Sequence, residues 1–387
     1  MSETTIETKP KGVSGLHGQM IREQIIGYLF VTPAVLIILI FGLFPIGYSL
    51  YMSTFNWSIR KGAFVGAKNY LTIFGSWENL LITLAGIGLL VLAFWVWGNA
   101  FKSLSKGAMI AKILAAVLLI ISGVVFLTGW GRMWDTGNTA YLKSLIVTVY
   151  YALGTVPAEI ILGMILAFIL YQDIIGKEFF RMIYFLPYVT PSVTTAVVFQ
   201  LIFSSRETSF ANTLIGWFGM DPLRWRFEPR PVTQLLGLDL SGFLAGPSLA
   251  LVSIIIYGIW SFVGYNTIIF LAGLGNVPKE TYEAADIDGA TTWQKFTSIT
   301  VPLLSPVTFY LTLIAFIGTF KAFNHIYVMR TPSAQDSVIT TSLLIFDRFY
   351  KANQFGVATS QAIVLFVVIL GLTFAQNKLM GERVFYG

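Results

Sequence analysis

The sequence predicts an all-α protein that crosses a membrane several times. Apolar residues make up 56% of its 387 residues and charged residues only 11%, a balance that is typical of polytopic membrane proteins. Crossing ~30 Å of hydrocarbon takes about 20 helical residues, and a backbone in lipid must satisfy its own hydrogen bonds, so long apolar stretches are expected to be helices. Eight such stretches lie at 27–50, 80–100, 109–130, 143–170, 182–203, 248–274, 307–329 and 357–376.

These stretches divide the chain into four parts. Residues 1–24 are polar, and we expect them to form a cytoplasmic tail. Residues 25–75 are expected to hold the first transmembrane helix and a short outer segment, and residues 77–139 a hairpin of two further transmembrane helices. Residues 140–387 then hold the remaining spans and a polar loop at 279–306.

The basic residues do not decide the orientation by number, since Lys and Arg are about equally frequent on the two sides. The short loop at 102–112 carries three lysines and no acidic residue, which indicates that this loop faces the cytoplasm. An even number of spans then places both termini in the cytoplasm.

Composition excludes several classes of function. The chain has no cysteine and two histidines, so we expect neither a disulfide nor an ordinary zinc site. The net charge of +6 is scattered along the chain, which indicates contact with membrane lipid rather than with nucleic acid. A phosphate-binding G-x4-G-K-[ST] pattern and the common hydrolase motifs are absent from the sequence. We therefore expect no catalytic residues, no metal and no cofactor.

The polar loop at 279–306 has the pattern of two short amphipathic helices. Apolar or small residues recur in it close to helical spacing, and Gly289 interrupts the pattern where the two helices would meet. Pro302 and Pro306 are expected to end the pattern. A helix–turn–helix between membrane spans is a suitable contact surface for a soluble partner.

This loop also carries a family resemblance. It is similar to the EAA loop in the permease subunits of binding-protein-dependent ABC importers, and further residues match the sugar-permease branch, which includes the maltose permease subunit. Residues 27–33, 44–49 and 64–70 resemble the first span and outer segment of that family. The matching loop positions, which the resemblance assigns to ATPase coupling, are Glu283, Ala284, Ala285, Asp288, Gly289, Ile299 and Pro302.

The resemblance implies an architecture and a set of partners. It implies a core six-helix importer domain in the bacterial cytoplasmic (inner) membrane, to which this chain adds the hairpin at 77–139, for eight transmembrane helices in total. The hairpin is either lipid-facing or a docking surface for an additional partner. The implied partners are two copies of a cytoplasmic ATP-binding subunit, an extracytoplasmic solute-binding protein, and a second permease subunit, which is expected to form a heterodimer with this chain.

Two features indicate where a substrate would bind. The segment Leu186–Ser192 contains two prolines four residues apart, which weakens the helix and frees carbonyl groups. The resemblance assigns its Tyr188 and Ser192 to the sugar site, and Trp260 also aligns with a sugar contact. Other sugar-contact positions of the maltose type are not matched, so the transported sugar is expected to differ.

The second feature is the polar groups at membrane depth, which are costly there unless they face a cavity or a partner. Lys321 lies among Thr319, Asn324 and His325, and it either lines the pathway or extends its amine to the outer interface. Glu159, near Pro157, is expected to hydrogen-bond between helices. Further polar candidates are Gln200, Tyr265 and Asn266. The predicted substrate site is Tyr188, Ser192, Trp260, Thr319, Lys321 and Asn324.

These observations favour a permease subunit of an ATP-driven importer for a di- or oligosaccharide or a similar solute, in which the outer loop at 205–247 contacts the binding protein. One alternative is an ion-coupled secondary transporter, which would need several intramembrane carboxylates. Another is an ABC importer for a non-sugar solute such as glycerol phosphate, and a third is a membrane enzyme acting on lipid-linked sugars.

Overall fold

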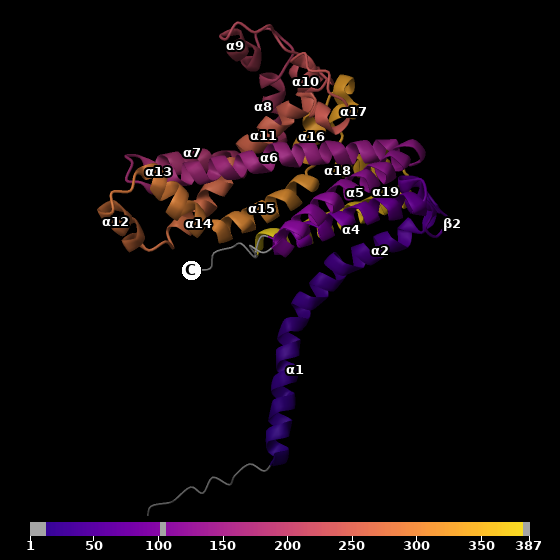
Figure 1. Ribbon diagram of the computed structural model, residues 1–387. Helices are drawn as coiled ribbons and strands as arrows, with labels where there is room; N and C mark the ends of the chain where they lie inside the picture. The colour runs from indigo at the N-terminus through magenta and orange to yellow at the C-terminus, as the bar shows by residue number, and fades with distance from the viewer. Residues whose placement is uncertain (1–12, 101–105, 382–387) are drawn as a thin grey trace, which may run out of the picture.

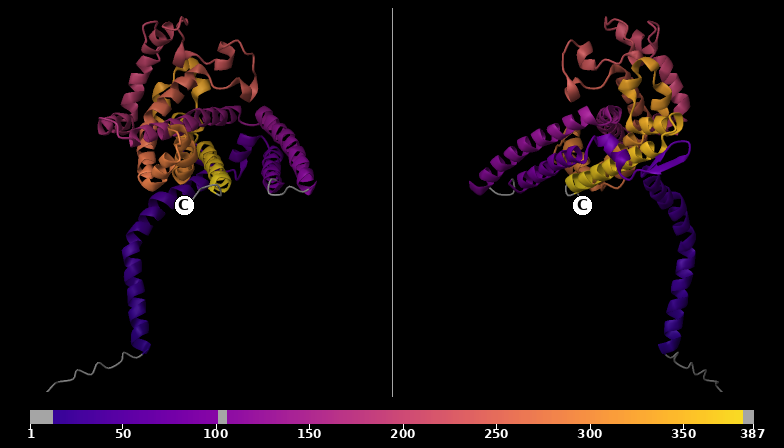
Figure 2. Two further views of the ribbon diagram at one scale, coloured as in Figure 1. Left: turned by 60° about the vertical axis from the view of Figure 1, so that its left-hand side comes forward. Right: turned by 90° about the vertical axis from the view of Figure 1, so that its right-hand side faces the viewer.

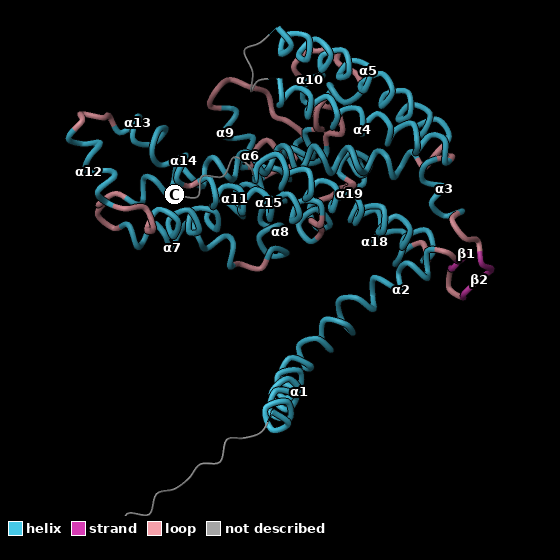
Figure 3. The backbone as a smooth tube through the Cα atoms, turned by 60° about the horizontal axis from the view of Figure 1, so that its bottom comes forward, coloured by secondary structure: helices cyan, strands magenta, loops and turns pink. Residues whose placement is uncertain are grey.

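The computed structural model describes residues 13–100 and 106–381. This part of the chain is almost entirely helical, with a single short pair of antiparallel strands (Figure 3). The elements, in chain order, are α1 (Val13–Ile37), η1 (Ile38–Leu43), α2 (Phe44–Ser53), β1 (Phe55–Trp57), β2 (Lys61–Phe64), α3 (Lys68–Phe74), α4 (Trp77–Ala100), α5 (Lys106–Thr136), α6 (Thr139–Tyr171), α7 (Lys177–Val189), α8 (Ser192–Ile202), α9 (Phe210–Gly216), η2 (Trp225–Phe227), α10 (Val232–Leu235), η3 (Gly242–Ala245), α11 (Leu249–Leu274), α12 (Lys279–Ile287), α13 (Thr292–Lys295), η4 (Phe296–Thr300), α14 (Val301–Leu303), α15 (Ser305–Phe320), α16 (Asn324–Met329), η5 (Pro332–Ala334), α17 (Gln335–Val338), α18 (Thr341–Phe346), η6 (Asp347–Lys351) and α19 (Phe355–Gly381).

The number of membrane-spanning helices agrees with the sequence. Within the described residues, six helices are long and apolar enough to cross a membrane, or up to eight if each of two bent helix pairs crosses as one span. The prediction of an all-α polytopic protein is therefore confirmed.

Two of the predicted stretches are not single straight helices. The stretch at 182–203 is divided between α7 and α8, which meet at an angle of 97°. The ring of Pro191 disfavours a helical residue before it, and Thr190 is accordingly extended, with φ −71° and ψ 137°. The stretch at 307–329 ends as a helix at Phe320, and α16 begins only at Asn324.

Pro302 lies at the end of a helical run, as predicted, whereas Pro306 begins a helix. The run Thr292–Leu303 ends one residue after Pro302, and Pro306 lies in the first two positions of α15. A proline is tolerated there because its missing N–H would have no partner inside the helix. The chain bends by 66° between α14 and α15, at Leu304.

Helix α1 extends away from the rest of the molecule, whereas the α2 that continues it packs against α19 (Figure 1). Together, α1, η1 and α2 form one helical run from Met20 to Ser53, and its apolar window is not buried against the chain. Of the predicted tail, residues 1–12 lie outside the described residues, whereas residues from Val13 onward are helical and continue directly into the first span. No proline lies between residues 13 and 26, so the helix can extend into the polar residues before the apolar stretch.

The predicted hairpin is formed by α4 and α5, which pack closely along their length on one flank of the body (Figure 2). Glycines allow the close approach: a Cβ on Gly86 would lie 2.6 Å from the backbone of Phe126, and one on Gly129 would lie 2.5 Å from Thr83. At the end of the hairpin near α6, Arg132 donates to Glu78 at 2.9 Å. The hairpin is thus held mainly by its own two helices.

The centre of the body is the contact between α6 and α11. Small residues on both helices permit it, as is common between membrane helices. A Cβ on Gly163 of α6 would lie 2.8 Å from the Cβ of Asn266, and one on Gly258 of α11 would lie 2.8 Å from the hydroxyl of Tyr151. This close contact brings the polar residues of both helices to the same place.

The polar loop and the strand pair lie at opposite ends of the helical body (Figure 1). The loop, with α12 and α13, follows the C-terminal end of α11, whereas β1 and β2 lie beside the start of α19. The segment that carries α9 and α10 projects from the body. The body therefore has two ends joined by long helices, as a protein that spans a membrane requires.

Candidate functional site

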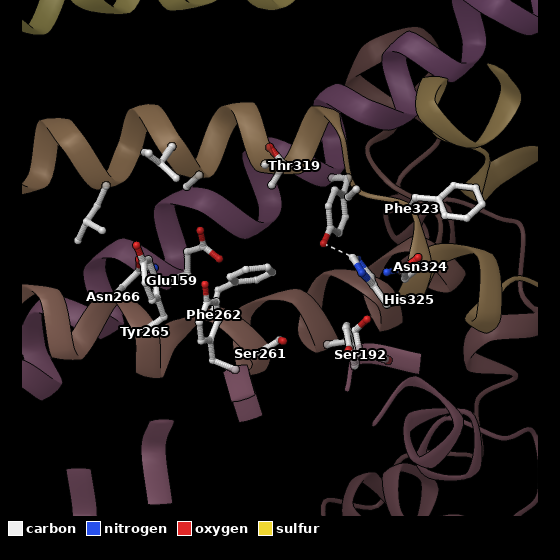
Figure 4. Close-up of a pocket in the computed structure, with 18 residues that line it drawn as sticks. Glu159, Ser192, Ser261, Phe262, Tyr265, Asn266, Thr319, Phe323, Asn324 and His325 are labelled. Atoms are coloured by element: carbon white, nitrogen blue, oxygen red, sulfur yellow. Dashed lines mark hydrogen bonds between the residues drawn. The ribbon is translucent and has the colours of Figure 1, made fainter. Parts of the chain in front are cut away.

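A cavity of about 300 Å³ lies among α6, α11 and α15, beside the two breaks that follow α7 and α15 (Figure 4). Its lining contains hydroxyl, amide and aromatic side chains, one carboxyl group and one imidazole. The lining residues with polar groups are Tyr151, Glu159, Tyr188, Ser192, Tyr257, Ser261, Tyr265, Asn266, Thr319, Asn324 and His325.

Helical spacing explains how α6 and α11 contribute to this lining. Tyr151 and Glu159 are eight residues apart, about two helical turns, so they lie on the same face of α6. Tyr257, Ser261 and Tyr265 follow one another at intervals of four on α11. Because the two helices pack together at their glycines, these two polar faces meet.

The break after α7 is held against α11 by hydrogen bonds. Tyr257 donates its hydroxyl to the carbonyl oxygen of Ser192 at 3.1 Å, and the same hydroxyl lies 2.8 Å from Oγ1 of Thr195. Tyr188, before the break, stacks on Tyr265 with ring centroids 4.6 Å apart. The 97° bend is thus fixed by specific contacts to a straight helix.

The break after α15 is held by His325. Its Nε2 lies 2.8 Å from the Tyr151 hydroxyl, and its ring stacks on Tyr257 with centroids 4.9 Å apart. Gln200 of α8 donates to the carbonyl oxygen of Val328 in α16. No glycine or proline lies at 321–323, so these tertiary contacts are what position α16.

Four of the six predicted substrate residues line the cavity, namely Tyr188, Ser192, Thr319 and Asn324. Trp260 does not line it and instead packs on Phe199 and Tyr257. Lys321 is also outside the lining, where it follows the last residue of α15 with its side chain exposed.

The cavity contains residues outside the predicted set. Glu159, Tyr265, Asn266 and His325 were recognisable as polar groups in apolar stretches, and all four line the cavity. Tyr151, Tyr257, Ser261 and Phe262 were missed, although the spacing of four residues between polar groups on α11 is a usable signal. Gln200, another candidate, holds α16 in place through its hydrogen bond to the carbonyl oxygen of Val328.

Glu159 is the most unusual residue of the site. It is 3% exposed, and its Oε2 has no hydrogen-bond partner among the described residues. The amide of Asn266 lies beside it, and the Nδ2 of this amide is also buried without a partner (Figure 4). Buried polar groups are nearly always hydrogen-bonded, so this pair has unused capacity to bind a ligand.

The polar loop at 279–306 has the two short helices that the sequence predicts. Helix α12 ends at Ile287, and Gly289 has φ +72°, a left-handed conformation that favours glycine. Thr291 then begins α13 with a reciprocal capping box to Gln294. The Lys295 ammonium, 2.6 Å from a carboxylate oxygen of Asp286, links the two helices.

This loop presents apolar side chains to the outside. Ile287 is 88% exposed and Trp293 71% exposed, and Glu283 beside them is exposed as well. Large apolar groups at such exposure are typical of a surface that a partner covers. Ile299 is half-buried, so the predicted coupling residues do not all share the exposed face.

The segment between α8 and α11 forms a second polar region. A cavity of about 680 Å³ lies between it, the N-terminal part of α6 and the segment around α17, and its lining includes Lys143, Tyr150 and Asp336. Arg230 donates two hydrogen bonds to the carboxylate of buried Glu228, at 2.8 and 3.0 Å. These bonds hold the pKa of Glu228 below its usual value.

Comparison with known proteins gives a consistent result. The arabinooligosaccharide transport system permease protein AraP of Bacillus subtilis is 32% identical over 265 residues, which cover 68% of this chain and 79% of that protein. The trehalose/maltose transport system permease protein MalF of Thermococcus litoralis is 26% identical over 364 residues, 92% of this chain and 94% of that protein.

A crystal structure of a bacterial alginate ABC transporter, in complex with an alginate pentasaccharide-bound periplasmic protein, has the same fold. It matches with a TM-score of 0.61 at 17% identity, covering 93% of this chain and 96% of that one. The relatives above are transport permeases and not enzymes, which confirms that prediction for this chain.

The family described as "Binding-protein-dependent transport system inner membrane component" matches residues 159–385. That range includes the polar loop at 279–306 and, apart from Tyr151, the polar lining of the cavity. The chain therefore belongs to this family of ABC importer permeases, as a multi-pass component of the inner membrane.

Proposed function

We propose that this chain forms the translocation pathway for a di- or oligosaccharide and transmits the work of a separate ATPase through residues 279–306. The observation that carries the proposal is the cavity among α6, α11 and α15, which is lined by hydroxyl, amide and aromatic groups at two helix breaks. The names of the relatives support the substrate class, because they include transporters of arabinooligosaccharides and of trehalose and maltose.

The lining suits the chemistry of a sugar. Sugar hydroxyls need donors and acceptors, which Ser192, Thr319 and Asn324 supply, and the apolar faces of sugar rings pack on aromatic rings such as Tyr188. Trp260 and Lys321 remain in the proposed site as residues at its edge, because their neighbours line the cavity while they do not. We therefore expect smaller effects from their substitution.

A second permease subunit would complete the pathway. Tyr188 and Asn324 line the cavity yet are exposed, so the cavity is open at the surface of this chain. The apolar window of Met20–Ser53 is also uncovered by this chain. A relative of this chain, packed against both surfaces as a heterodimer partner, would close the cavity and cover the helix.

Two separate parts of the chain suit the other two partners. At one end of the body, the exposed Ile287 and Trp293 with Glu283 form an apolar surface with a charge beside it, which an ATP-binding subunit would cover. The segment at 205–247 and its 680 Å³ cavity would receive the solute-binding protein. Two copies of the ATPase are expected, one for each permease subunit.

This arrangement predicts an orientation. The loop at 279–306 and both termini would lie in the cytoplasm, and the segment at 205–247 outside. The natural chain has no cysteine, so single-cysteine variants report their side without a background signal. In intact cells, a membrane-impermeant maleimide should label Arg224→Cys and should not label Thr292→Cys, and the reverse pattern contradicts the orientation.

The function is tested by uptake into proteoliposomes. The complete complex, with its ATPase, second permease and binding protein, should accumulate a radiolabelled neutral oligosaccharide when ATP is supplied on the side of the polar loop at 279–306. Tyr188→Ala and Ser192→Ala should each reduce uptake by about ten-fold, because losing one hydrogen bond or packing contact costs ~1–3 kcal/mol. Uptake driven by an ion gradient without ATP would contradict the proposal and favour a secondary transporter.

A further inference from the structure

The unused polar groups of Glu159 and Asn266 carry an inference about substrate charge. We propose that this pair is a hydroxyl-binding subsite in a cavity that selects neutral sugars over acidic or phosphorylated ones. The inference rests on the proposed function, since it specifies the substrate of the same cavity.

The first step is the hydrogen-bond capacity of the pair. Oε2 of Glu159 and Nδ2 of Asn266 are buried and have no partner among the described residues. Together they offer an acceptor and a donor side by side in the cavity wall. A sugar hydroxyl both donates and accepts a hydrogen bond, so one hydroxyl, or two adjacent ones, would satisfy both groups.

The second step is the charge of the whole lining. Among the described residues that line the cavity, none is a lysine or an arginine, and the one carboxyl group is that of Glu159. His325 is already bonded to the Tyr151 hydroxyl. Lys321 lies outside the lining, with its side chain exposed.

An anionic substrate would meet unfavourable surroundings here. Its carboxylate or phosphate would lose water without gaining a positive partner, and burying an unpaired charge is strongly unfavourable. The cavity therefore favours a neutral oligosaccharide and disfavours glycerol phosphate.

The geometry of α6 and α11 shows how the pair is positioned. Asn266 approaches α6 directly over Gly163, where a Cβ would lie 2.8 Å from the Cβ of Asn266. Glu159 lies one turn before Gly163 on the same helix. The small residue thus allows the amide to come beside the carboxyl group.

The test is equilibrium binding to the permease complex in nanodiscs, without the binding protein. The probes are three radiolabelled neutral trisaccharides (maltotriose, arabinotriose and xylotriose) and one acidic trisaccharide, trigalacturonate. The complex should bind at least one neutral probe roughly ten-fold or more tightly than trigalacturonate. Glu159→Leu and Asn266→Leu each remove one of the two polar groups, and each should weaken binding of the neutral probe by about ten-fold.

The control variant is Glu78→Gln. It changes an exposed carboxylate of the hairpin, which is bonded to Arg132, and it should leave both affinities unchanged. Tighter binding of trigalacturonate than of every neutral probe, or unchanged affinity for the neutral probe in both Glu159→Leu and Asn266→Leu, would overturn the inference and leave the oligosaccharide function intact. Binding of none of the four probes would count against the proposed function itself.

Discussion

The turn at Gly289 allows a graded test of coupling between the permease and its ATPase. Gly289 has φ +72°, and a Cβ added there would meet no atom within 4 Å. Substitution should therefore strain the backbone without a steric clash. The series Gly289→Asn, Gly289→Ala and Gly289→Pro varies this strain while leaving the rest of the loop unchanged.

The expected size of the effect follows from the backbone conformation. A left-handed conformation costs an L-residue such as alanine roughly 1–2 kcal/mol, which corresponds to about a 5- to 30-fold loss in the population of the native turn. Asparagine tolerates this conformation better and should lose less. Proline cannot adopt it, since its ring holds φ near about −65°, and should abolish the turn.

The assay is ATP hydrolysis by the reconstituted complex with and without substrate-loaded binding protein. Stimulation by substrate should decrease in the order glycine, asparagine, alanine, proline, while co-purification of the permease subunits is retained. Gly88→Ala is the matched control, because its Cβ also meets nothing within 4 Å and its φ is not positive. Full stimulation in Gly289→Pro would show that this turn does not transmit the coupling.

Three further outcomes are expected. Gly163→Ala should lower the thermal midpoint of the complex by a few degrees and weaken neutral-sugar binding, because overpacking against Asn266 costs ~1–3 kcal/mol; an unchanged midpoint and affinity would contradict the close contact. Arg230 holds the pKa of Glu228 below its usual value, so the folded segment at 205–247 is stabilised above the unfolded carboxyl pKa and loses this stabilisation as the pH falls through the lower folded pKa. Limited proteolysis of that segment should therefore begin at a higher pH in Arg230→Ala than in the native chain, and identical pH profiles would contradict the role of the pair. Lys321→Ala should reduce uptake less than the ten-fold expected for residues that line the cavity, and a greater loss would place Lys321 inside the pathway.

Local sequence patterns are sufficient for the number and position of the long helices. Lipid imposes two simple requirements, apolar side chains and internally satisfied backbone hydrogen bonds, and both can be read from composition over about 20 residues. The turn of the polar loop at 279–306 is also local, because Gly289 and the Thr291–Gln294 capping box act within a few residues of themselves. The family resemblance depended on the same local spacing.

The helix breaks were only partly predictable. Pro191 indicates the first break, because a proline restricts the conformation of the residue before it. The 97° angle of this break, in contrast, is set by the hydrogen bond from Tyr257 of α11 to Ser192 after the break. The second break, at 321–323, has no local cause in the sequence. It depends on His325 reaching Tyr151, a residue 174 positions away along the chain.

The membership of the site is likewise a tertiary property. Polar residues in apolar stretches, such as Glu159 and Lys321, can be recognised one by one from the sequence. Composition cannot tell which of them faces a cavity, because that depends on how neighbouring helices are rotated and how closely they approach. The glycines at the contact of α6 and α11 bring Glu159 and Asn266 together inside the cavity wall, whereas the end of α15 leaves Lys321 outside the lining.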